Sequence, residues 1–465
     1  MRIHLIGIGG TGMGALAGLL CEAGHEVRGS DGPLYPPMST QLAELGVPLF
    51  EGHRAENLDW GPDRVVVGNI CRKDHPEAVA AQQRGLKLTS FPALLSELFL
   101  GERHSLVVAG THGKTTTASL LAHLLRVAGE DPGFLIGGVP RDLGRGYALG
   151  RPPYFVVEGD EYDTAFFDKR PKFVHYQPRT VILTSVEFDH ADIYPTMADV
   201  ERAFAMLVER IPAEGRLVVC AEAEVALRLA REARCPVQSY STRGAADWQA
   251  VLTPAGERQE LCVRGPGLAG SERYEISLSG EHNAQNALAV IAVGRGLGLS
   301  AEVVGRALSS FRGVHRRQEV RGQAAGVTVI DDFAHHPTAI RETLRGLRRL
   351  HPGRLWAVFE PRSATSRRNL LQHELALALA EADAVVIGPL HQPEGIPLEE
   401  RFDPELAATE VRAAGRQAQH LPSTEAALAH LVASCRPGDT VVVMSSGGFG
   451  GLIEKLLRAL EERGS

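Results

Sequence analysis

The sequence predicts an α/β protein of three consecutive domains, each built around a parallel sheet. Its 465 residues correspond to about three domains of roughly 150 residues each. Strand-like and helix-like segments alternate along the chain, which is typical of parallel sheets covered by helices. Glycine-rich or acidic loops follow several apolar strands, at the sheet edge where such proteins bind their ligands.

The first predicted domain spans residues 1–103. Its expected strands and helix lie, in chain order, at 3–7, 13–21 (the helix), 25–30 and 63–68. The polar segment 100–103 ends this domain, because a new apolar strand begins at residue 105.

The second predicted domain spans residues 104–314 and the third spans 315–465. In the second we expect strands at 105–109, 154–157 and 180–184, a β-like, turn-rich stretch at 253–280 and a helix at 283–296. In the third we expect strands at 327–330, 355–359, 384–387 and 440–444. Buried parallel strands that end in polar residues deliver those residues to a site.

The composition excludes several classes of protein. With 44% hydrophobic and 23% charged residues and a net charge of −7, the chain is an ordinary globular one without a case for nucleic-acid binding. No apolar run reaches the roughly 18 residues of a membrane span, and no signal peptide is expected. Six cysteines without a Cys-x-x-Cys pair argue against a disulfide framework or a zinc site and favour a cytoplasmic location.

The first glycine-rich loop follows the first predicted strand and precedes a helix. It has the form Gly-x-Gly-x-x-Gly, whose backbone N–H groups approach a diphosphate at a helix N-terminus. An acid ends the next strand, where a ribose-binding acid is expected. On these residues alone we favour a dinucleotide such as NAD, and a tight turn is the alternative. The residues concerned are Gly7, Gly9, Gly10, Thr11, Gly12 and Asp31.

The second glycine-rich loop resembles a P-loop, although it is shorter than the usual form. Lys114 would reach the β- and γ-phosphates of a nucleotide, and Thr115 or Thr116 would place a hydroxyl on Mg²⁺. Only six lysines occur in the chain, so a chance match is rare. The predicted phosphate-binding residues are Gly110, Thr111, His112, Gly113, Lys114, Thr115 and Thr116.

Two acidic segments follow the next strands of the same domain. Residues 158–163 carry four carboxylates, and residues 187–190 carry two more with a histidine. Carboxylate oxygens suit Mg²⁺. Either segment alone is more typical of a solvated loop, but together they favour a metal site beside the P-loop. His190 could ligate a metal or orient a carboxylate.

A third constellation, residues 331–337, opens the last domain with paired acids and paired histidines. It favours proton handling or ribose contacts, and the alternative is a helix cap by Asp332 with surface histidines. Residues 280–286 could cap a helix. Residues 314–319 could be a linker, or their arginines could stabilise charge on a transferring phosphoryl group.

Together the residues predict phosphoryl transfer or ATP hydrolysis at a magnesium site, with a second nucleotide-like ligand on the first domain. An oxidoreductase would leave Lys114 without a role. A regulatory ATP-binding switch would give no role to Asp332 and His335.

Five motifs, in this order, resemble those of the Mur ligases, the ATP-dependent amide-forming enzymes of peptidoglycan synthesis. They are Gly-Thr-His-Gly-Lys-Thr-Thr (110–116), Glu-x-Asp-Glu (158–161), Glu-x-Asp-His (187–190), His-Asn-x-x-Asn (282–286) and Asp-Asp-x-x-His-His-Pro (331–337). The resemblance covers essentially the whole chain. It implies a Rossmann-like UDP-sugar-binding domain, a central P-loop ATPase-like domain and a Rossmann-like C-terminal domain that binds the incoming peptide.

Two branches of that family share the first-loop form Gly-x-Gly-Gly, one adding L-alanine and one adding a murein tripeptide. Segments 35–40, 160–170, 172–176, 360–363 and 444–451 are similar to the tripeptide branch. The resemblance thus implies ATP, UDP-N-acetylmuramate and L-alanyl-γ-D-glutamyl-meso-diaminopimelate as substrates. The implied process is peptidoglycan recycling, with cell-wall biogenesis, cell shape and cell division as its setting. The L-alanine reaction is the alternative.

The resemblance also implies a role for each site residue. Lys114 would hold the phosphates, Thr115 and Glu158 one Mg²⁺, and His190 a second. Asn283 would contact adenine and Asp332 the ribose. Arg317 would reach the nucleotide from the domain junction, and His335 would help orient the incoming amine. The peptide would meet Arg362, Ser446 and Gly447. The first loop would then bind UDP, so the NAD interpretation is withdrawn.

Two departures from the family's pattern leave the coordination of the second Mg²⁺ open. Some relatives carry a carbamylated lysine, but this chain has no lysine between Lys172 and Lys455. Ser185 stands where relatives often carry asparagine. The sequence gives no prediction of the oligomeric state.

Overall fold

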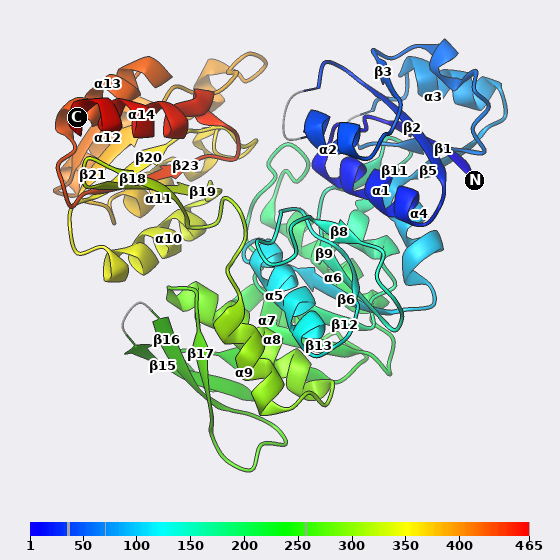
Figure 1. Cartoon of the computed structure of the whole chain (residues 1–465), viewed down its shortest axis with the longest axis horizontal. Helices are drawn as coiled ribbons and strands as arrows, with labels where there is room; N and C mark the ends of the chain where they lie inside the picture. Colours follow the sequence, from blue (N-terminus) through cyan, green and yellow to red (C-terminus); the bar gives the residue numbers. More distant parts are fainter. Residues whose placement is uncertain (35–37, 70, 256–257, 465) are drawn as a thin grey trace.

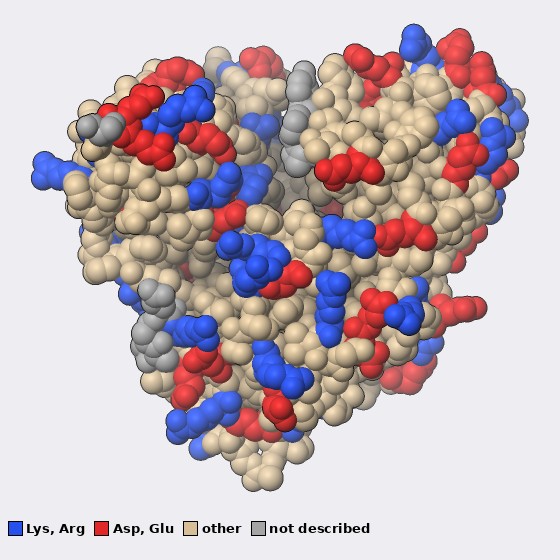
Figure 2. All heavy atoms as spheres, viewed as in Figure 1, with Lys and Arg blue, Asp and Glu red and all other residues tan. Residues whose placement is uncertain are grey.

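The computed structural model describes residues 1–34, 38–69, 71–255 and 258–464. The chain forms three α/β units, each with its own large sheet. In Figure 1 the N-terminal unit (blue) and the C-terminal unit (yellow to red) lie side by side above the central unit. Figure 2 shows a notch between the two upper units, with acidic and basic side chains interspersed over this face.

The N-terminal unit contains a five-stranded parallel sheet of order β3-β2-β1-β4-β5. Its strands are β1 (Arg2–Ile6), β2 (Glu26–Asp31), β3 (Leu49–Glu51), β4 (Arg64–Val67) and β5 (Lys87–Ser90). Its helices are α1 (Thr11–Glu22), α2 (Met38–Glu44), η1 (Ala55–Leu58), α3 (Pro76–Gln83), α4 (Phe91–Leu95) and η2 (Ser96–Leu100). Strand order reverses between β1 and β4, so the loops after these strands border the ligand crevice expected of such sheets.

The central unit contains a ten-stranded sheet of order β17-β16-β15-β14-β13-β12-β6-β9-β7-β8. Its strands are β6 (His104–Ala109), β7 (Gly133–Leu135), β8 (Tyr147–Ala148), β9 (Tyr154–Gly159), β12 (Thr180–Leu183), β13 (Arg216–Cys220), β14 (Val237–Ser241), β15 (Trp248–Ala255), β16 (Arg258–Arg264) and β17 (Glu272–Ile276). The middle strands from β7 to β15 pair in parallel, whereas β15, β16 and β17 form an antiparallel extension. A separate hairpin is formed by β10 (Asp163–Ala165) and β11 (Asp168–Pro171).

Helices cover both faces of the central sheet. On one face, α5 (Lys114–Val127), α8 (Glu281–Gly296) and α9 (Ala301–Ser310) share an apolar core with the strands. On the other face lie η3 (Lys172–His175), α6 (Met197–Arg210) and α7 (Glu224–Ala230).

One apolar core runs from the N-terminal unit into the central unit. Leu5 and Leu16 belong to the same cluster as Phe155 and Phe204. Helix α1 packs so closely on β8 that a Cβ at Gly18 would lie 2.1 Å from Tyr147 Cζ. The first two units are therefore joined by continuous hydrophobic packing.

The C-terminal unit contains a six-stranded sheet of order β18-β19-β23-β20-β21-β22, parallel except for the edge strand β18. Its strands are β18 (Glu319–Ala324), β19 (Val327–Asp332), β20 (Leu355–Phe359), β21 (Ala384–Ile387), β22 (Gln417–His420) and β23 (Thr440–Met444). Its helices are α10 (Pro337–Leu350), η4 (Asn369–Leu371), α11 (Gln372–Leu379), η5 (Leu398–Glu400), α12 (Pro404–Ala413), α13 (Thr424–Ser434), η6 (Phe449–Gly451) and α14 (Leu452–Gly464). Two apolar clusters of its own fill the two faces of this sheet.

The predicted α/β fold class is confirmed, but antiparallel strands occur at three sheet edges: at both ends of the central sheet and at β18 of the C-terminal sheet. The stretch predicted as β-like at 253–280 lies mostly in β15, β16 and β17. Part of the segment 35–40, residues 35–37, lies outside the described residues. Of the helices described, none has the length and apolarity needed to cross a bilayer. All six cysteines are free thiols.

Candidate active site

A cavity of about 410 Å³ lies between the central and C-terminal units. Its walls come from the loop after β6, the start of α8, the segment that connects the two units, and the end of β19 with α10. Predicted nucleotide-binding residues from four separate motifs line it: His112, Gly113, Thr115, Thr116, Asn283, Arg317 and Asp332. The fold therefore brings these motifs, which are far apart in sequence, to one site.

The P-loop-like turn requires glycine at two positions. Gly110 has a φ of +136°, and a Cβ there would lie 2.1 Å from Thr184 Oγ1. Gly113 has a φ of +78°, and a Cβ there would lie 2.6 Å from Asn286 Oδ1. Left-handed backbone and close neighbours both exclude a side chain, so the turn can lie directly on β12 and α8.

Lys114 is held by a carboxylate that the sequence analysis did not single out. Its Nζ donates to both carboxylate oxygens of Glu161 at 2.9 Å and to Gly110 O at 2.6 Å. Glu161 lies two residues after β9 and is 2% exposed. Burial alone would lower the pKa of Lys114, but the carboxylates of Glu161, Glu158 and Asp160 together outweigh burial and raise it. Lys114 is therefore a charged group already paired inside the loop.

Thr115 and Glu158, the residues predicted to share a Mg²⁺, are in direct contact. Thr115 Oγ1 donates to Glu158 Oε1 at 2.9 Å, and Gly137 N donates to Glu158 Oε2 at 2.8 Å. Arg317, from the connecting segment, places Nη2 3.4 Å from Thr115 Oγ1. A hydroxyl beside a carboxylate is a donor set that fits Mg²⁺, which prefers oxygen ligands.

His190 contacts Glu161 rather than Thr115 or Glu158. Its Nε2 lies 2.9 Å from Glu161 Oε1. Burial, the largest single effect, lowers the pKa of His190, but the hydrogen bond to Glu161 and the charges of Glu161 and Asp189 together outweigh burial and raise it. Glu161 thus bridges the lysine of the loop and the histidine predicted as a metal ligand.

A second group of potential ligands spans the two units and was only partly anticipated. His112 Nε2 lies 3.4 Å from Glu187 Oε2, and His336 Nδ1 lies 3.8 Å from the same oxygen. Burial alone would raise the pKa of Glu187, but His112, Thr338 and His336 together outweigh burial and lower the pKa to about 2. These three side chains could hold a cation. Of the two adjacent histidines, His335 is the one predicted to contact the incoming amine, and its Nε2 lies 3.8 Å from Asp189 Oδ2.

The remaining nucleotide-contact candidates are fixed by backbone groups. Asp332 accepts hydrogen bonds from Gln318 N and Ala334 N, both at 2.7 Å. Asn283 Nδ2 donates to Ser279 O at 2.7 Å. Burial raises the pKa of Asp332, and burial lowers the pKa of His282, beside Asn283, to about 4.

In the N-terminal unit, Asp31 organises the first glycine-rich loop. Its Oδ2 accepts from Gly9 N at 2.6 Å and its Oδ1 from Gly32 N at 2.8 Å. A Cβ on Gly9 would lie 2.2 Å from Leu34 Cδ2 and 2.8 Å from Asp31 Oδ2. The loop also includes Gly7, Gly10, Thr11 and Gly12 and lies between β1 and α1.

The predicted peptide-binding residues adjoin one another on the loops after β20 and β23. A Cβ on Gly447 would lie 2.1 Å from Arg362 Nε. Arg362 Nη1 lies 3.6 Å from Glu360 Oε1. Arg316 Nη2 donates to Gly447 O at 2.6 Å, on the residue that follows the half-buried Ser446. These side chains face the same edge of the sheet as Asp332.

Comparisons with known proteins agree along the whole chain. The family model for the "Mur ligase middle domain" matches residues 108–294. The model "Mur ligase, glutamate ligase domain" matches 316–447, and "Mur ligase family, catalytic domain" matches 2–103.

Three similar proteins illustrate the relationship. The UDP-N-acetylmuramate–L-alanyl-γ-D-glutamyl-meso-2,6-diaminoheptandioate ligase of Escherichia coli (strain K12) is 43% identical over 100% of this chain and 99% of its own. The UDP-N-acetylmuramate–L-alanine ligase of Anaeromyxobacter sp. (strain Fw109-5) is 36% identical over 99% of this chain and 98% of its own. A crystal structure of a murein peptide ligase from Psychrobacter arcticus is 39% identical, covers 99% of both chains and has a TM-score of 0.74. The chain therefore belongs to the Mur ligase family.

Proposed function

We propose that this protein is an ATP-dependent ligase that joins the tripeptide L-alanyl-γ-D-glutamyl-meso-diaminopimelate to UDP-N-acetylmuramate in peptidoglycan recycling. Thr115 and Arg317 line one cavity and contact each other, and Thr115 also contacts Glu158; this arrangement supports the ATP-dependent part of the proposal. The tripeptide acceptor is supported by 43% identity to a ligase named for that substrate, against 36% to one named for L-alanine. The alternative is therefore the L-alanine reaction.

The proposal gives each domain one substrate. Residues 1–103 bind the UDP-sugar through the first loop and Asp31. Residues 104–314 bind ATP, and residues 315–465 bind the peptide and complete the nucleotide site. We propose the cytoplasm as the location, with cell-wall biogenesis, cell shape and cell division as the processes served.

In the first step, a lactyl carboxylate oxygen attacks the γ-phosphorus of ATP, ADP leaves, and an acyl phosphate forms. Lys114 exchanges Glu161 for phosphate oxygens, and Arg317 offsets the negative charge that accumulates on the transferring group. Thr115 and Glu158 would hold a Mg²⁺ ion, which would supply further charge neutralisation. A second Mg²⁺ at His190 is part of the proposal.

In the second step, the amine nitrogen of the tripeptide attacks the acyl carbonyl carbon, the amide bond forms, and phosphate leaves. His335 orients the incoming amine, while Arg362 with the loop at Ser446 and Gly447 receives peptide carboxylates. Asn283 contacts adenine and Asp332 the ribose. Because the nucleotide meets two domains, their closure excludes water from the acyl phosphate.

The test is ATP turnover with UDP-N-acetylmuramate and either L-alanine or the tripeptide as acceptor. We expect one ADP and one phosphate for each amide bond formed with the tripeptide. Rapid turnover with L-alanine alone would assign the chain to the alternative reaction. Turnover with neither acceptor would contradict both assignments.

A further inference from the structure

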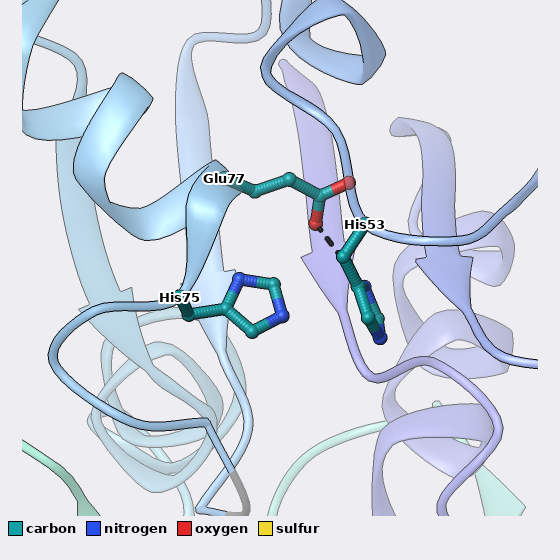
Figure 3. Close-up of side chains that lie close together, drawn as sticks. All are labelled: His53, His75 and Glu77. Atoms are coloured by element: carbon teal, nitrogen blue, oxygen red, sulfur yellow. Dashed lines mark ion pairs between the residues drawn. The ribbon is translucent and has the colours of Figure 1, made fainter.

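Three side chains of the N-terminal unit converge away from the cavity that receives ATP. His53 lies between β3 and η1, His75 directly precedes α3, and Glu77 is in the first turn of α3. Figure 3 shows Glu77 approaching from the helix, with the two imidazole rings on either side below its carboxylate. The three come from two segments that meet at the carboxyl end of the sheet.

The polar atoms of these three side chains are close enough to bind one metal ion after small side-chain movements. His53 Nδ1 lies 3.7 Å from Glu77 Oε2, and the three potential ligand atoms lie within 4.8 Å of one another. A tetrahedral zinc ion with bonds of about 2.05 Å holds its ligand atoms about 3.3 Å apart. Each ligand atom would have to move by less than about 1 Å, which side-chain rotation provides.

One nitrogen of each of these two imidazole rings lacks a hydrogen-bond partner. The Nδ1 atoms of His53 and His75 are both shielded from solvent, and neither has a hydrogen-bond partner among the residues that the structure describes. Buried polar atoms are normally paired, so an orphaned nitrogen on each ring needs an explanation. A cation that accepts both nitrogen lone pairs supplies one.

The carboxylate also lacks a strong counter-charge. Glu77 is fully buried and accepts hydrogen bonds from Ser30 Oγ, at 2.5 Å, and from Asn57 Nδ2. Its ion-pair partners within the described ranges are His4 and His53, each at 3.7 Å, and no lysine or arginine. A buried carboxylate whose ion-pair partners are imidazoles alone is suited to a bound cation.

We propose that His53, His75 and Glu77 form a binding site for a zinc ion. Two imidazoles and one carboxylate are typical zinc ligands, and the fourth position would take a water molecule or a ligand oxygen. Mg²⁺ is disfavoured because it prefers an all-oxygen octahedron. The ligand set contains no cysteine, so the absence of a Cys-x-x-Cys pair does not bear on it. Zinc here would tie the loop after β3 to the start of α3.

The experiment measures zinc retained by the full-length protein. The chelator-stripped protein is incubated with ZnCl₂ in excess Mg²⁺ and desalted, and zinc per chain is measured by mass spectrometry. His53→Ala and His75→Ala are compared with His373→Ala, which removes an exposed histidine of α11. Glu77 is left intact, because it also anchors Ser30 and Asn57.

We expect the wild-type protein and His373→Ala to retain one zinc ion that His53→Ala and His75→Ala lose. Loss of an outer-shell partner weakens metal binding about 10–100-fold, so loss of a ligand should weaken it by more than about 100-fold. Zinc should raise the thermal midpoint of the wild type and not of these two variants. Melting curves of the metal-free proteins show whether each variant is folded.

The cluster of His112, Glu187 and His336 is the competing zinc site, and His336→Ala distinguishes the two. Retention of zinc in His336→Ala together with its loss in His75→Ala supports the proposal. Equal zinc in the wild type, His53→Ala and His75→Ala would overturn it, as would zinc lost only in His336→Ala. None of these outcomes depends on the ligase reaction, because the readout is metal content.

Discussion

Under the proposed function, the Glu161 carboxylate competes with the nucleotide phosphates for Lys114. To bind phosphate oxygens, the Lys114 ammonium group has to leave a carboxylate that it contacts at 2.9 Å through both oxygens. The substitution Glu161→Gln keeps the shape of the side chain and removes its charge. It should therefore destabilise the free protein and strengthen ATP binding.

The magnitude follows from the surroundings of the lysine. Removing one member of a buried ion pair costs about 3–5 kcal/mol. Lys114 keeps Gly110 O at 2.6 Å and Thr111 O at 3.4 Å, so we expect about 3 kcal/mol for the free protein. With phosphate in place of Glu161, the cost should fall to about 1 kcal/mol. The difference of about 2 kcal/mol corresponds to ATP binding about 30-fold more tightly.

The assay combines urea denaturation of the free protein with calorimetric titration of a non-hydrolysable ATP analogue. Asp160→Asn is the matched control, because it makes the same kind of change one residue earlier and removes the partner of Lys172, at 2.7 Å. We expect the control to lose stability without gaining ATP affinity. Unchanged or weaker ATP binding by Glu161→Gln would refute the competition.

Three further predictions concern the same machinery. Arg362→Ala should raise the KM for the tripeptide about 10–100-fold, because one or two charge-assisted hydrogen bonds are lost, and should leave the KM for ATP unchanged. Steady-state kinetics measure both constants, and a higher KM for ATP alone would contradict the prediction. Gly110→Ala should destabilise the protein by more than about 2 kcal/mol and abolish ATP binding, because its Cβ would lie 2.1 Å from Thr184 Oγ1 on left-handed backbone. Urea denaturation measures the loss, and a midpoint equal to that of the wild type would contradict the prediction. Burial lowers the pKa of His282 to about 4 in the folded state. Below pH about 6.5 this histidine is protonated in the unfolded state and stays neutral in the folded state. The free energy of unfolding should therefore fall as the pH drops from about 6.5 towards about 4. His282→Gln should flatten this part of the urea-midpoint profile whereas His373→Gln should not, and equal slopes in both variants would exclude His282 as the cause.

The sequence could predict the motifs of the site and the class of fold, because both depend on local pattern. Apolar strands followed by glycine or carboxylate appear in the sequence, and parallel strands bring their carboxyl ends to one edge. Strands such as β5 (Lys87–Ser90) and β22 (Gln417–His420) were missed because they are short, largely polar and held by their neighbours rather than by an apolar run.

Contacts between motifs could not be predicted in the same way. Glu161 was visible in an acidic segment, but its pairing with Lys114 depends on the register between β6 and β9. The approach of His336 to His112 depends on how the C-terminal unit docks on the central one. Sequence periodicity carries no information on strand register or on domain docking. These two contacts could therefore be found only from the three-dimensional structure.

The shared core of the first two units limits how this protein can move. The C-terminal unit keeps its own cores, and the chain enters it through Arg316 and Gln318, which have φ values of 61° and 48°. The first glycine-rich loop and the P-loop-like turn therefore lie on two units that share one apolar core, whereas the C-terminal unit shares no apolar cluster with them among the described residues. Under the proposed function, we expect domain motion during turnover to occur between the central and C-terminal units, with the UDP-sugar site and the phosphate loop keeping their relative positions.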